Sequence, residues 1–123
     1  MPSRPKFKGK IVIGLIESVT LIGNNKQKKR IKAKIDTGAT KSSIDTKLAS
    51  NLKLGPIIKS KLVKSAQGNK LRPVIEAQVI LAGKKLKGEF TLADRAHMRY
   101  KVLIGQNLLK QGFIIDPTRG VKN

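Results

Sequence analysis

Short apolar runs that alternate with polar positions recur along the whole chain. In residues 31–35, Ile31, Ala33 and Ile35 alternate with Lys32 and Lys34, which is the period of a half-buried strand. Comparable strand-like runs occupy residues 11–17, 18–22, 57–65, 71–81, 86–92, 102–104 and 113–115. Turn-forming residues separate them, so the pattern predicts an all-β barrel or sandwich of about seven or eight short strands.

The segments between these runs predict turns and little helix. Residues 23–25 and 82–85 are typical of hairpin turns, because Gly and Asn tolerate positive φ. We expect a charged, solvated loop at residues 26–30, a short helix or irregular segment at 46–52, and one helical turn at 108–111. For domain organisation, we expect a basic N-terminal arm at residues 1–10, one barrel domain at 11–119 and a tail at 120–123.

Charge and composition narrow the classes of function. The 123 residues include 27 Lys and Arg but only 7 Asp and Glu, giving a net charge of +20. Such a surface attracts nucleic acid, anionic membranes or acidic protein segments, or it serves only as a solvated coat. Aromatic residues make up 3%, so the core must consist of Ile, Leu and Val, and a base-stacking platform is disfavoured.

Cysteine is absent and His97 is the single histidine. Disulfides, thiolate metal sites and Cys nucleophiles are therefore excluded, and a zinc site, which takes three or four protein ligands, is opposed by the ligand count. We expect neither a metal nor another cofactor. The apolar run at residues 11–16 is interrupted by Gly14 and is too short for a membrane span, so we expect a cytoplasmic protein without membrane association.

One carboxylate stands apart as a candidate for chemistry. Asp36 directly follows the apolar strand at 31–35 and precedes Thr37, Gly38 and Ala39. Asp-Thr-Gly by itself is compatible with an ordinary turn. Later in the chain, however, residues 103–105 have the sequence Leu-Ile-Gly, and Asn-Leu-Leu follows at residues 107–109.

These two segments resemble the half-site motif of the retropepsin-like aspartic peptidases. Three ordered stretches, at residues 33–43, 94–105 and 113–117, are similar to a bacterial and archaeal branch historically called "ATP-dependent zinc proteases". Members of that branch accompany ATP-grasp ligases that add glutamates to proteins. The resemblance spans residues 11–119 and implies a small closed barrel of retropepsin type, with a flap hairpin and one short helix.

The resemblance also implies an aspartic mechanism in a homodimer. Two close carboxylates cannot both ionise, so one acts as general base on water while the other donates a proton. The chain has one Asp-Thr-Gly, so two copies of Asp36 require two subunits. Thr37 would lock the two loops together, Gly38 would allow close approach, and Ala39 would leave room beside the cleft. The turn at Gly105 would pack behind the Asp36 loop.

Further residues are expected to bind substrate. The hairpin at residues 62–74 is the candidate flap, tipped by Ala66, Gln67, Gly68 and Asn69. Arg95 and Arg99, with the lysines near Asp36, would hold carboxylates of an acidic or glutamylated protein or peptide. We also expect weak, non-specific affinity for nucleic acid. The alternative function is a catalytically silent basic β-barrel that binds RNA or the ribosome; a third, a metallopeptidase, is opposed by the ligand count.

Overall fold

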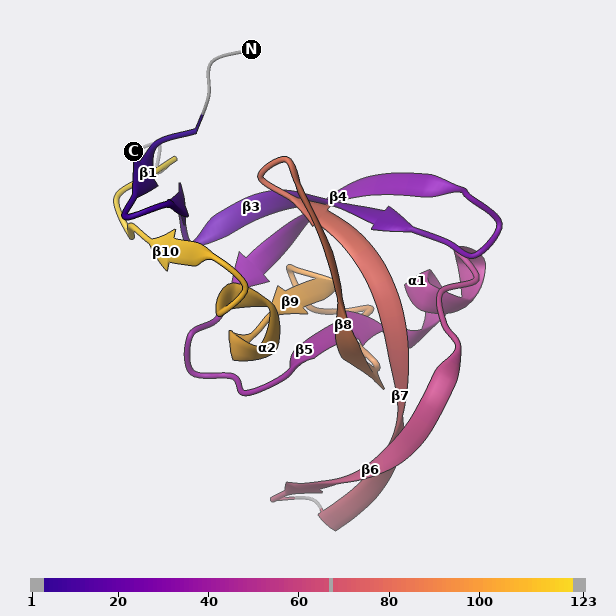
Figure 1. Ribbon diagram of the computed structural model, residues 1–123. Coiled ribbons are helices and arrows are strands. Elements are labelled where there is room, and N and C mark those ends of the chain that lie inside the picture. The colour runs from indigo at the N-terminus through magenta and orange to yellow at the C-terminus, as the bar shows by residue number, and fades with distance from the viewer. Residues whose placement is uncertain (1–3, 67, 121–123) are drawn as a thin grey trace.

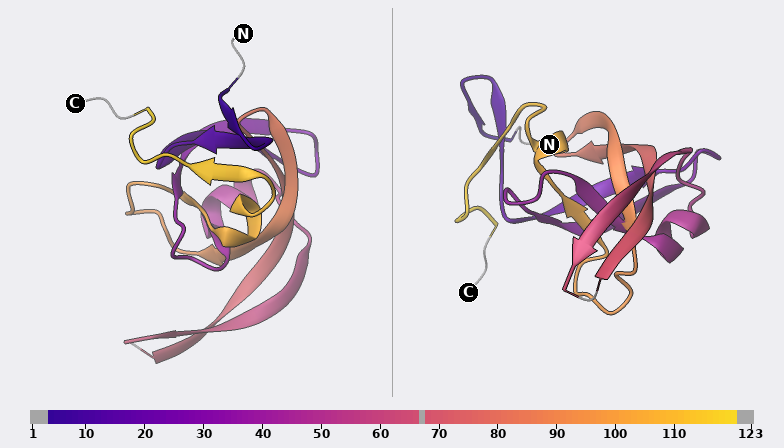
Figure 2. Two further views of the ribbon diagram at one scale, coloured as in Figure 1. Left: turned by 60° about the vertical axis from the view of Figure 1, so that its left-hand side comes forward. Right: turned by 90° about the horizontal axis from the view of Figure 1, so that it is seen from below.

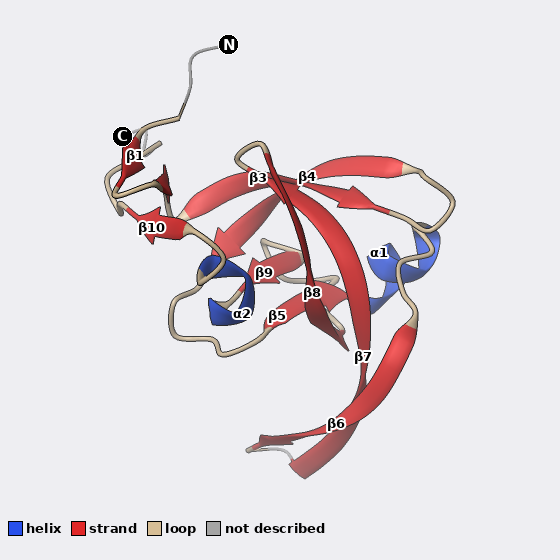
Figure 3. Cartoon of the chain, in the orientation of Figure 1, coloured by secondary structure: helices blue, strands red, loops and turns tan. Residues whose placement is uncertain are grey.

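The computed structural model describes residues 4–66 and 68–120, and this part of the chain consists almost entirely of strands (Figures 1 and 3). Its elements are β1 (Lys6–Phe7), β2 (Lys10–Ile13), β3 (Ile16–Ile22), β4 (Lys28–Ile35), β5 (Ser42–Asp45), α1 (Thr46–Asn51), β6 (Ile57–Ser65), β7 (Gly68–Leu81), β8 (Lys84–Ala93), β9 (Val102–Ile104), α2 (Gln106–Leu109) and β10 (Phe113–Ile115).

Six strands form a closed barrel. They are hydrogen-bonded in the order β3-β4-β9-β5-β8-β7, and β7 pairs back with β3 to close the ring. Most neighbours are antiparallel, but β4 pairs with β9, and β5 with β8, in parallel. The expectation of an all-β closed barrel is therefore confirmed. Of the two short helices, α1 lies within the segment expected at 46–52, and α2 begins two residues before the helical turn expected at 108–111.

Aliphatic side chains fill the barrel, as the scarcity of aromatic residues predicted. Alternate residues of each strand point inward; on β3 these include Val19 and Leu21, which are fully buried. Phe90 and Phe113 are the aromatic members of this core. The inward positions of β4, β7, β8 and β9 contribute residues that include Ala33, Ile35, Ile75, Val79, Leu81, Leu86, Val102 and Ile104.

A second, three-stranded sheet joins the two ends of the described chain. Strand β2 pairs with β1 on one side and, in parallel, with β10 on the other. Arg4, in the expected N-terminal arm, donates two hydrogen bonds to the buried carboxylate of Glu17, at 2.7 and 3.0 Å. The amide of Gly14 donates to the same carboxylate at 2.7 Å.

The structure corrects two expectations about local elements. The expected loop at residues 26–30 is partly strand, since β4 begins at Lys28 and pairs with β3 through Ile22 and Thr20. Its charged side chains are exposed, so charge did not oppose strand formation there. Strand β5 was not expected at all, because four residues are too few for a visible period. The expected hairpin at residues 82–85 is present, with positive φ at Ala82 and Gly83.

The β6–β7 hairpin extends well beyond the barrel (Figure 2). Strand β6 pairs only with β7, so it forms an edge outside the closed ring. The pairing runs from Ile57 opposite Ile75 to Ser65 opposite Gly68 at the tip. Neither helix of the described chain has the length and apolar character that crossing a membrane requires.

Candidate active site

Asp36 is the first residue after β4, and its loop is tightly held. The Asp36 amide donates to the carbonyl of Ile104 on β9 at 2.9 Å, which continues the β4–β9 pairing. The Asp36 carboxylate is half-buried, and its Oδ1 accepts a hydrogen bond from the Gly38 amide at 2.9 Å. The Ala39 amide donates to the Asp36 carbonyl at 3.3 Å. The carboxylate thus has a fixed position at the end of β4, next to the buried Ile35.

The turn at Gly105 lies directly against this loop, as the sequence predicted. The amide of Gln106 donates to the Ala39 carbonyl at 2.7 Å, and the side-chain amide of Gln106 donates to the Thr37 carbonyl, also at 2.7 Å. A Cβ on Gly105 would come within 2.3 Å of the Lys41 carbonyl oxygen, so only glycine fits without displacement. The two motifs that are distant in sequence therefore form one unit.

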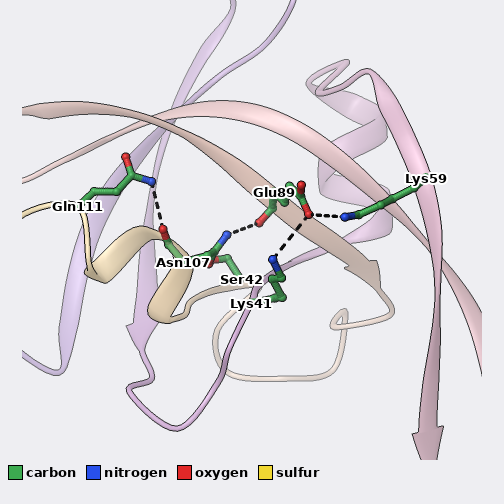
Figure 4. Close-up of polar contacts among 6 residues, drawn as sticks. All are labelled: Lys41, Ser42, Lys59, Glu89, Asn107 and Gln111. Atoms are coloured by element: carbon green, nitrogen blue, oxygen red, sulfur yellow. Dashed lines mark hydrogen bonds and ion pairs between the residues drawn. The ribbon is translucent and has the colours of Figure 1, made fainter.

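A chain of polar contacts continues from this unit into the barrel wall (Figure 4). The hydroxyl of Ser42 accepts from the Gly105 amide at 2.9 Å and donates to Asn107 Oδ1 at 2.8 Å. Asn107 Nδ2 in turn donates to the carbonyl of Glu89 at 2.9 Å. Ser42 is buried, so these bonds fix β5, the start of α2 and β8 relative to the Asp36 loop. Sequence reasoning quoted Ser42 and Asn107 within motifs but assigned them no role.

The carboxylate of Glu89 connects the loop after Asp36 with the base of the β6–β7 hairpin (Figure 4). Its Oε1 lies 3.1 Å from Lys59 Nζ on β6 and 3.9 Å from Lys41 Nζ. These three residues, with Lys61 and Val74, line a pocket of about 280 Å³, whose other lining residues are Ser60 and Thr91. Three lysines and one glutamate line the pocket, so it carries an excess of positive charge.

Arg95 is close to the Asp36 loop but is largely buried. Its backbone amide donates to Asp45 Oδ1 at 2.8 Å, and its Nε donates to the Tyr100 carbonyl at 3.1 Å. Burial lowers the pKa of the Arg95 guanidinium, while the carboxylates of Asp45 and Asp36 act in the opposite direction. Asp45 also accepts from the Leu48 amide at 3.2 Å and so caps helix α1.

The remaining predicted substrate-binding residues lie apart from this group. Arg99 is exposed; its guanidinium lies 5.6 Å from the ring centre of Tyr100, and it lines a hollow with Lys32 on the outside of the barrel. Ala66, Gly68 and Asn69 are at the tip of the β6–β7 hairpin, while Gln67 lies outside the described residues. Asn69 already pairs with Lys64, so the turn is narrower than the four expected residues.

No cluster of three or more His, Cys, Asp or Glu side chains that could hold a metal ion occurs in residues 4–66 and 68–120. His97 is exposed in the loop between β8 and β9.

Two solved structures with this fold are similar to the chain. One is a protein of unknown function from Legionella pneumophila, with a TM-score of 0.59 and 22% identity over 86% of this chain and 92% of that one. The other is the solution structure of the simian foamy virus protease, with a TM-score of 0.58 and 18% identity over 77% of this chain and 91% of the viral one. No curated protein matches the sequence.

At 18–22% identity, structural similarity shows the fold alone, and the family is identified by a family model. The model of the RimB-like family, described as retropepsin-like aspartic endopeptidase RimB, matches residues 45–121, beginning after the Asp36 loop. The match covers more than half of the chain and confirms the resemblance drawn from the three motifs. The chain belongs to the RimB-like family of retropepsin-like aspartic endopeptidases.

Proposed function

We propose that the protein is active as a homodimer in which each subunit contributes one Asp36. The observation that carries this proposal is the geometry of the Asp36 loop, whose half-buried carboxylate is fixed at the end of β4 by Ile104 and Gly38. One chain supplies one such loop, and the family's mechanism needs two carboxylates. A two-fold axis through two Asp36 loops supplies both.

In this dimer the two carboxylates share one proton. The ionised Asp36 takes a proton from the attacking water, and the protonated Asp36 donates to the carbonyl oxygen of the scissile bond. Thr37 is exposed and its carbonyl is held by Gln106, which leaves its hydroxyl for a hydrogen bond across the axis. Gly38 and Ala39 keep the loop compact enough for the second loop and the substrate to approach.

The substrate we propose is an acidic or glutamylated segment of a protein. The pocket formed by Lys41, Lys59, Lys61 and Glu89 supports this, because its excess positive charge suits a carboxylate. The pocket lies between the loop that follows Asp36 and the base of the β6–β7 hairpin. The hairpin, tipped by residues 66–69, would close over the bound segment and exclude water.

Arg95 and Arg99 have different places in this proposal. The Asp36 carboxylate is one of the two charges that act to raise the pKa of Arg95, and Arg95 would serve as a positioning residue that supplies positive charge near the Asp36 loop. Arg99 lies on the outer side of the barrel and would meet only a long acidic segment. We further infer that residues 11–119 form one domain, flanked by the arm at 1–10 and the tail at 120–123, and that the protein acts in the cytoplasm.

Substitution of Asp36 by asparagine tests the catalytic assignment. The side-chain oxygen of the introduced asparagine can still accept from the Gly38 amide, so the fold is retained while the general base is lost. Asp94→Asn is the matched control, because Asp94 Oδ1 accepts from the Ala96 amide at 3.2 Å in the same local geometry. We expect hydrolysis of an oligoglutamate-tailed protein to be abolished by Asp36→Asn, retained in Asp94→Asn, and unaffected by a strong chelator. Activity in Asp36→Asn, or zinc-dependent rescue after chelation, would overturn the assignment.

A further inference from the structure

The outer side of the barrel at β3 and β4 carries a regular row of cationic side chains. The exposed residues Lys28, Arg30 and Lys32 alternate along β4 and point away from the core, about 6.6 Å apart at the usual strand rise. Their partners across β3 are Ile22, Thr20 and Ser18. Lysine and arginine thus face aliphatic and hydroxyl side chains rather than acids on this surface.

The strand pairings extend this surface across two further strands. Thr20 pairs with Ile80 of β7, which pairs with Lys85 of β8, so Arg30 and Lys85 lie at the two ends of one row across the sheet. The next row runs from Lys28 through Ile22 and Gln78 to Lys87 in the same way. We call the outward side chains of these two rows, together with Ser18 and Lys32, the β3–β4 face.

The β3–β4 face is hollowed and its borders are also basic. Two hollows of about 800 and 810 Å³ meet at Ile80, and the second is bordered by Arg4, Lys84 and Arg119. The acids beside the face are already neutralised: the buried Glu17 by Arg4, and Glu76 by Lys87 at a distance of 3.2 Å. Arg4 and Lys87 are occupied by these pairs, whereas Lys28, Arg30, Lys32 and Lys85 have no ion pair among the described residues, so they leave the face with a net positive charge.

This face is separate from the Asp36 loop and from the pocket at Glu89, although Lys32 at its border also lines the hollow with Arg99. Figures 1 and 2 show β3 and β4 on the side of the barrel away from the tip of the β6–β7 hairpin. An acidic segment bound between that hairpin and the Asp36 loop leaves the row from Arg30 to Lys85 unoccupied. The cations of the β3–β4 face therefore need a different explanation from substrate binding.

We propose that the β3–β4 face binds the sugar–phosphate backbone of double-stranded RNA without reading its sequence. Rows of lysine and arginine neutralise phosphates, which gives affinity but no base specificity. The face has no aromatic residue for stacking on single-stranded bases. The two helices have six and four residues, so the described chain offers no long helix for the major groove of DNA.

The wide, shallow minor groove of A-form RNA suits such a surface better. It displays 2′-hydroxyl groups between the phosphates, and proteins recognise it by shape and by contacts to those hydroxyls. Ser18 and Thr20 are half-buried hydroxyl side chains on β3 opposite Lys32 and Arg30 of β4, and Thr20 also pairs with Ile80 of β7. They can exchange hydrogen bonds with 2′-hydroxyls while Lys28, Arg30 and Lys32 contact phosphates.

The test compares two variants with the same net charge. Arg30→Gln/Lys32→Gln removes two cations from the face, and Lys47→Gln/Lys110→Gln removes two exposed cations from the helical segments. Binding to a 20-base-pair RNA duplex is measured by fluorescence anisotropy between 50 and 300 mM salt. At 150 mM salt we expect the Arg30→Gln/Lys32→Gln variant to bind the duplex at least about fivefold more weakly than the wild type. The slope of log affinity against log salt concentration should decrease in magnitude by about two. The affinity of the control variant should change less than about twofold.

Equal weakening in both variants would overturn the proposal, because the binding would then follow total charge and not the β3–β4 face. Tighter binding to a DNA duplex of the same length would overturn the assignment to RNA. Anionic vesicles and polyglutamate are tested in parallel. If either binds the face variant more weakly than the wild type, while RNA binds both equally, the face would be assigned to a membrane or to an acidic protein. Matching thermal unfolding midpoints for the two variants and the wild type establish that all are folded.

Discussion

The hydroxyl of Ser42 accepts a hydrogen bond of 2.9 Å from the amide of Gly105, although the two residues are 63 positions apart in the sequence. The same hydroxyl donates to Asn107, so a single buried side chain joins β5, the Gly105 turn and the start of α2. The turn in turn holds the Asp36 loop through Gln106. The position of the proposed catalytic carboxylate therefore depends on a serine that does not touch it.

Replacing Ser42 with alanine should lower the free energy of unfolding by about 1–3 kcal/mol, because the Gly105 amide and the Asn107 side-chain oxygen lose a buried partner. The neighbouring Ser43→Ala is the control and should cost less than about 0.5 kcal/mol. Urea unfolding measures both. Similar costs at the two positions would show that the Ser42 bonds contribute little.

Mixing active and inactive subunits should reveal whether the site is shared. If every site needs two copies of Asp36, a wild-type subunit paired with an Asp36→Asn subunit is inactive. A threefold excess of Asp36→Asn should therefore reduce wild-type activity to about one quarter, by random pairing. An equal amount of an unrelated basic protein serves as the control. Undiminished activity would mean that one chain carries a complete site.

Two substitutions in the pocket formed by Lys41, Lys59, Lys61 and Glu89 should change the KM for an acidic substrate in opposite directions. Lys59→Ala removes a cation that an acidic substrate would use, and we expect the KM for an acidic peptide to rise about three- to tenfold. Glu89→Gln removes the competing carboxylate, so the same KM should fall. The KM for a neutral peptide should change little in either variant. Lys87→Ala, which breaks the distant pair with Glu76, is the control for loss of charge. Parallel changes for acidic and neutral peptides would contradict a carboxylate pocket.

The hydrogen bonds accepted by the Asp116 carboxylate predict that the stability of the fold depends on pH. Hydrogen bonds from the Thr118 hydroxyl and amide hold the pKa of Asp116 below its ordinary value. Since the folded pKa is depressed, this stabilisation is present above the unfolded value near 3.9 and is lost as the pH falls through the folded pKa. Thr118→Val should therefore raise the Asp116 pKa, as measured by carboxyl NMR titration.

The difference in thermal unfolding midpoint between the wild type and Thr118→Val follows from the same linkage. It should be largest near neutral pH and disappear in strong acid, below both pKa values. Thr46→Val, at an exposed threonine, should show no such pH-dependent difference. A difference that persists in strong acid would point to packing at Thr118 and not to the Asp116 carboxylate.

Local patterns predicted much of the barrel because alternation of apolar residues reports burial directly. Strand β9 and strand β10 have the bounds expected from their short apolar runs. The first part of β4 was wrongly expected to be a loop, because Lys28 and Arg30 lie on an open face where the main-chain pairing with β3, and not side-chain burial, decides the conformation. Strand β5 gave no visible signal and forms through its neighbours β8 and β9.

In the candidate site, too, some contacts could be predicted from the sequence and others could not. The packing of Gly105 against the Asp36 loop was predictable, because the two motifs occur together in a known family. The bonds from Gln106 to Thr37 and from Asn107 to Glu89 were not, because a side chain's partner across 69 or 18 positions depends on strand register, which the sequence pattern does not contain. Arg99 shows that a sequence motif does not fix where a side chain lies. Its neighbours in sequence suggested a place in the substrate site, but the fold puts it beside Lys32 on the outer side of the barrel.

The parallel pairing of β2 with β10 has a mechanical consequence. Three residue pairs, from Phe113 opposite Ile11 to Ile115 opposite Ile13, join a strand near the start of the described chain to its last strand. A force that pulls the two chain ends apart acts along these parallel strands in opposite directions, so it loads their hydrogen bonds together in shear and not one after another. The fold should therefore resist stretching from its ends more strongly than unzipping from the free edge of the β6–β7 hairpin.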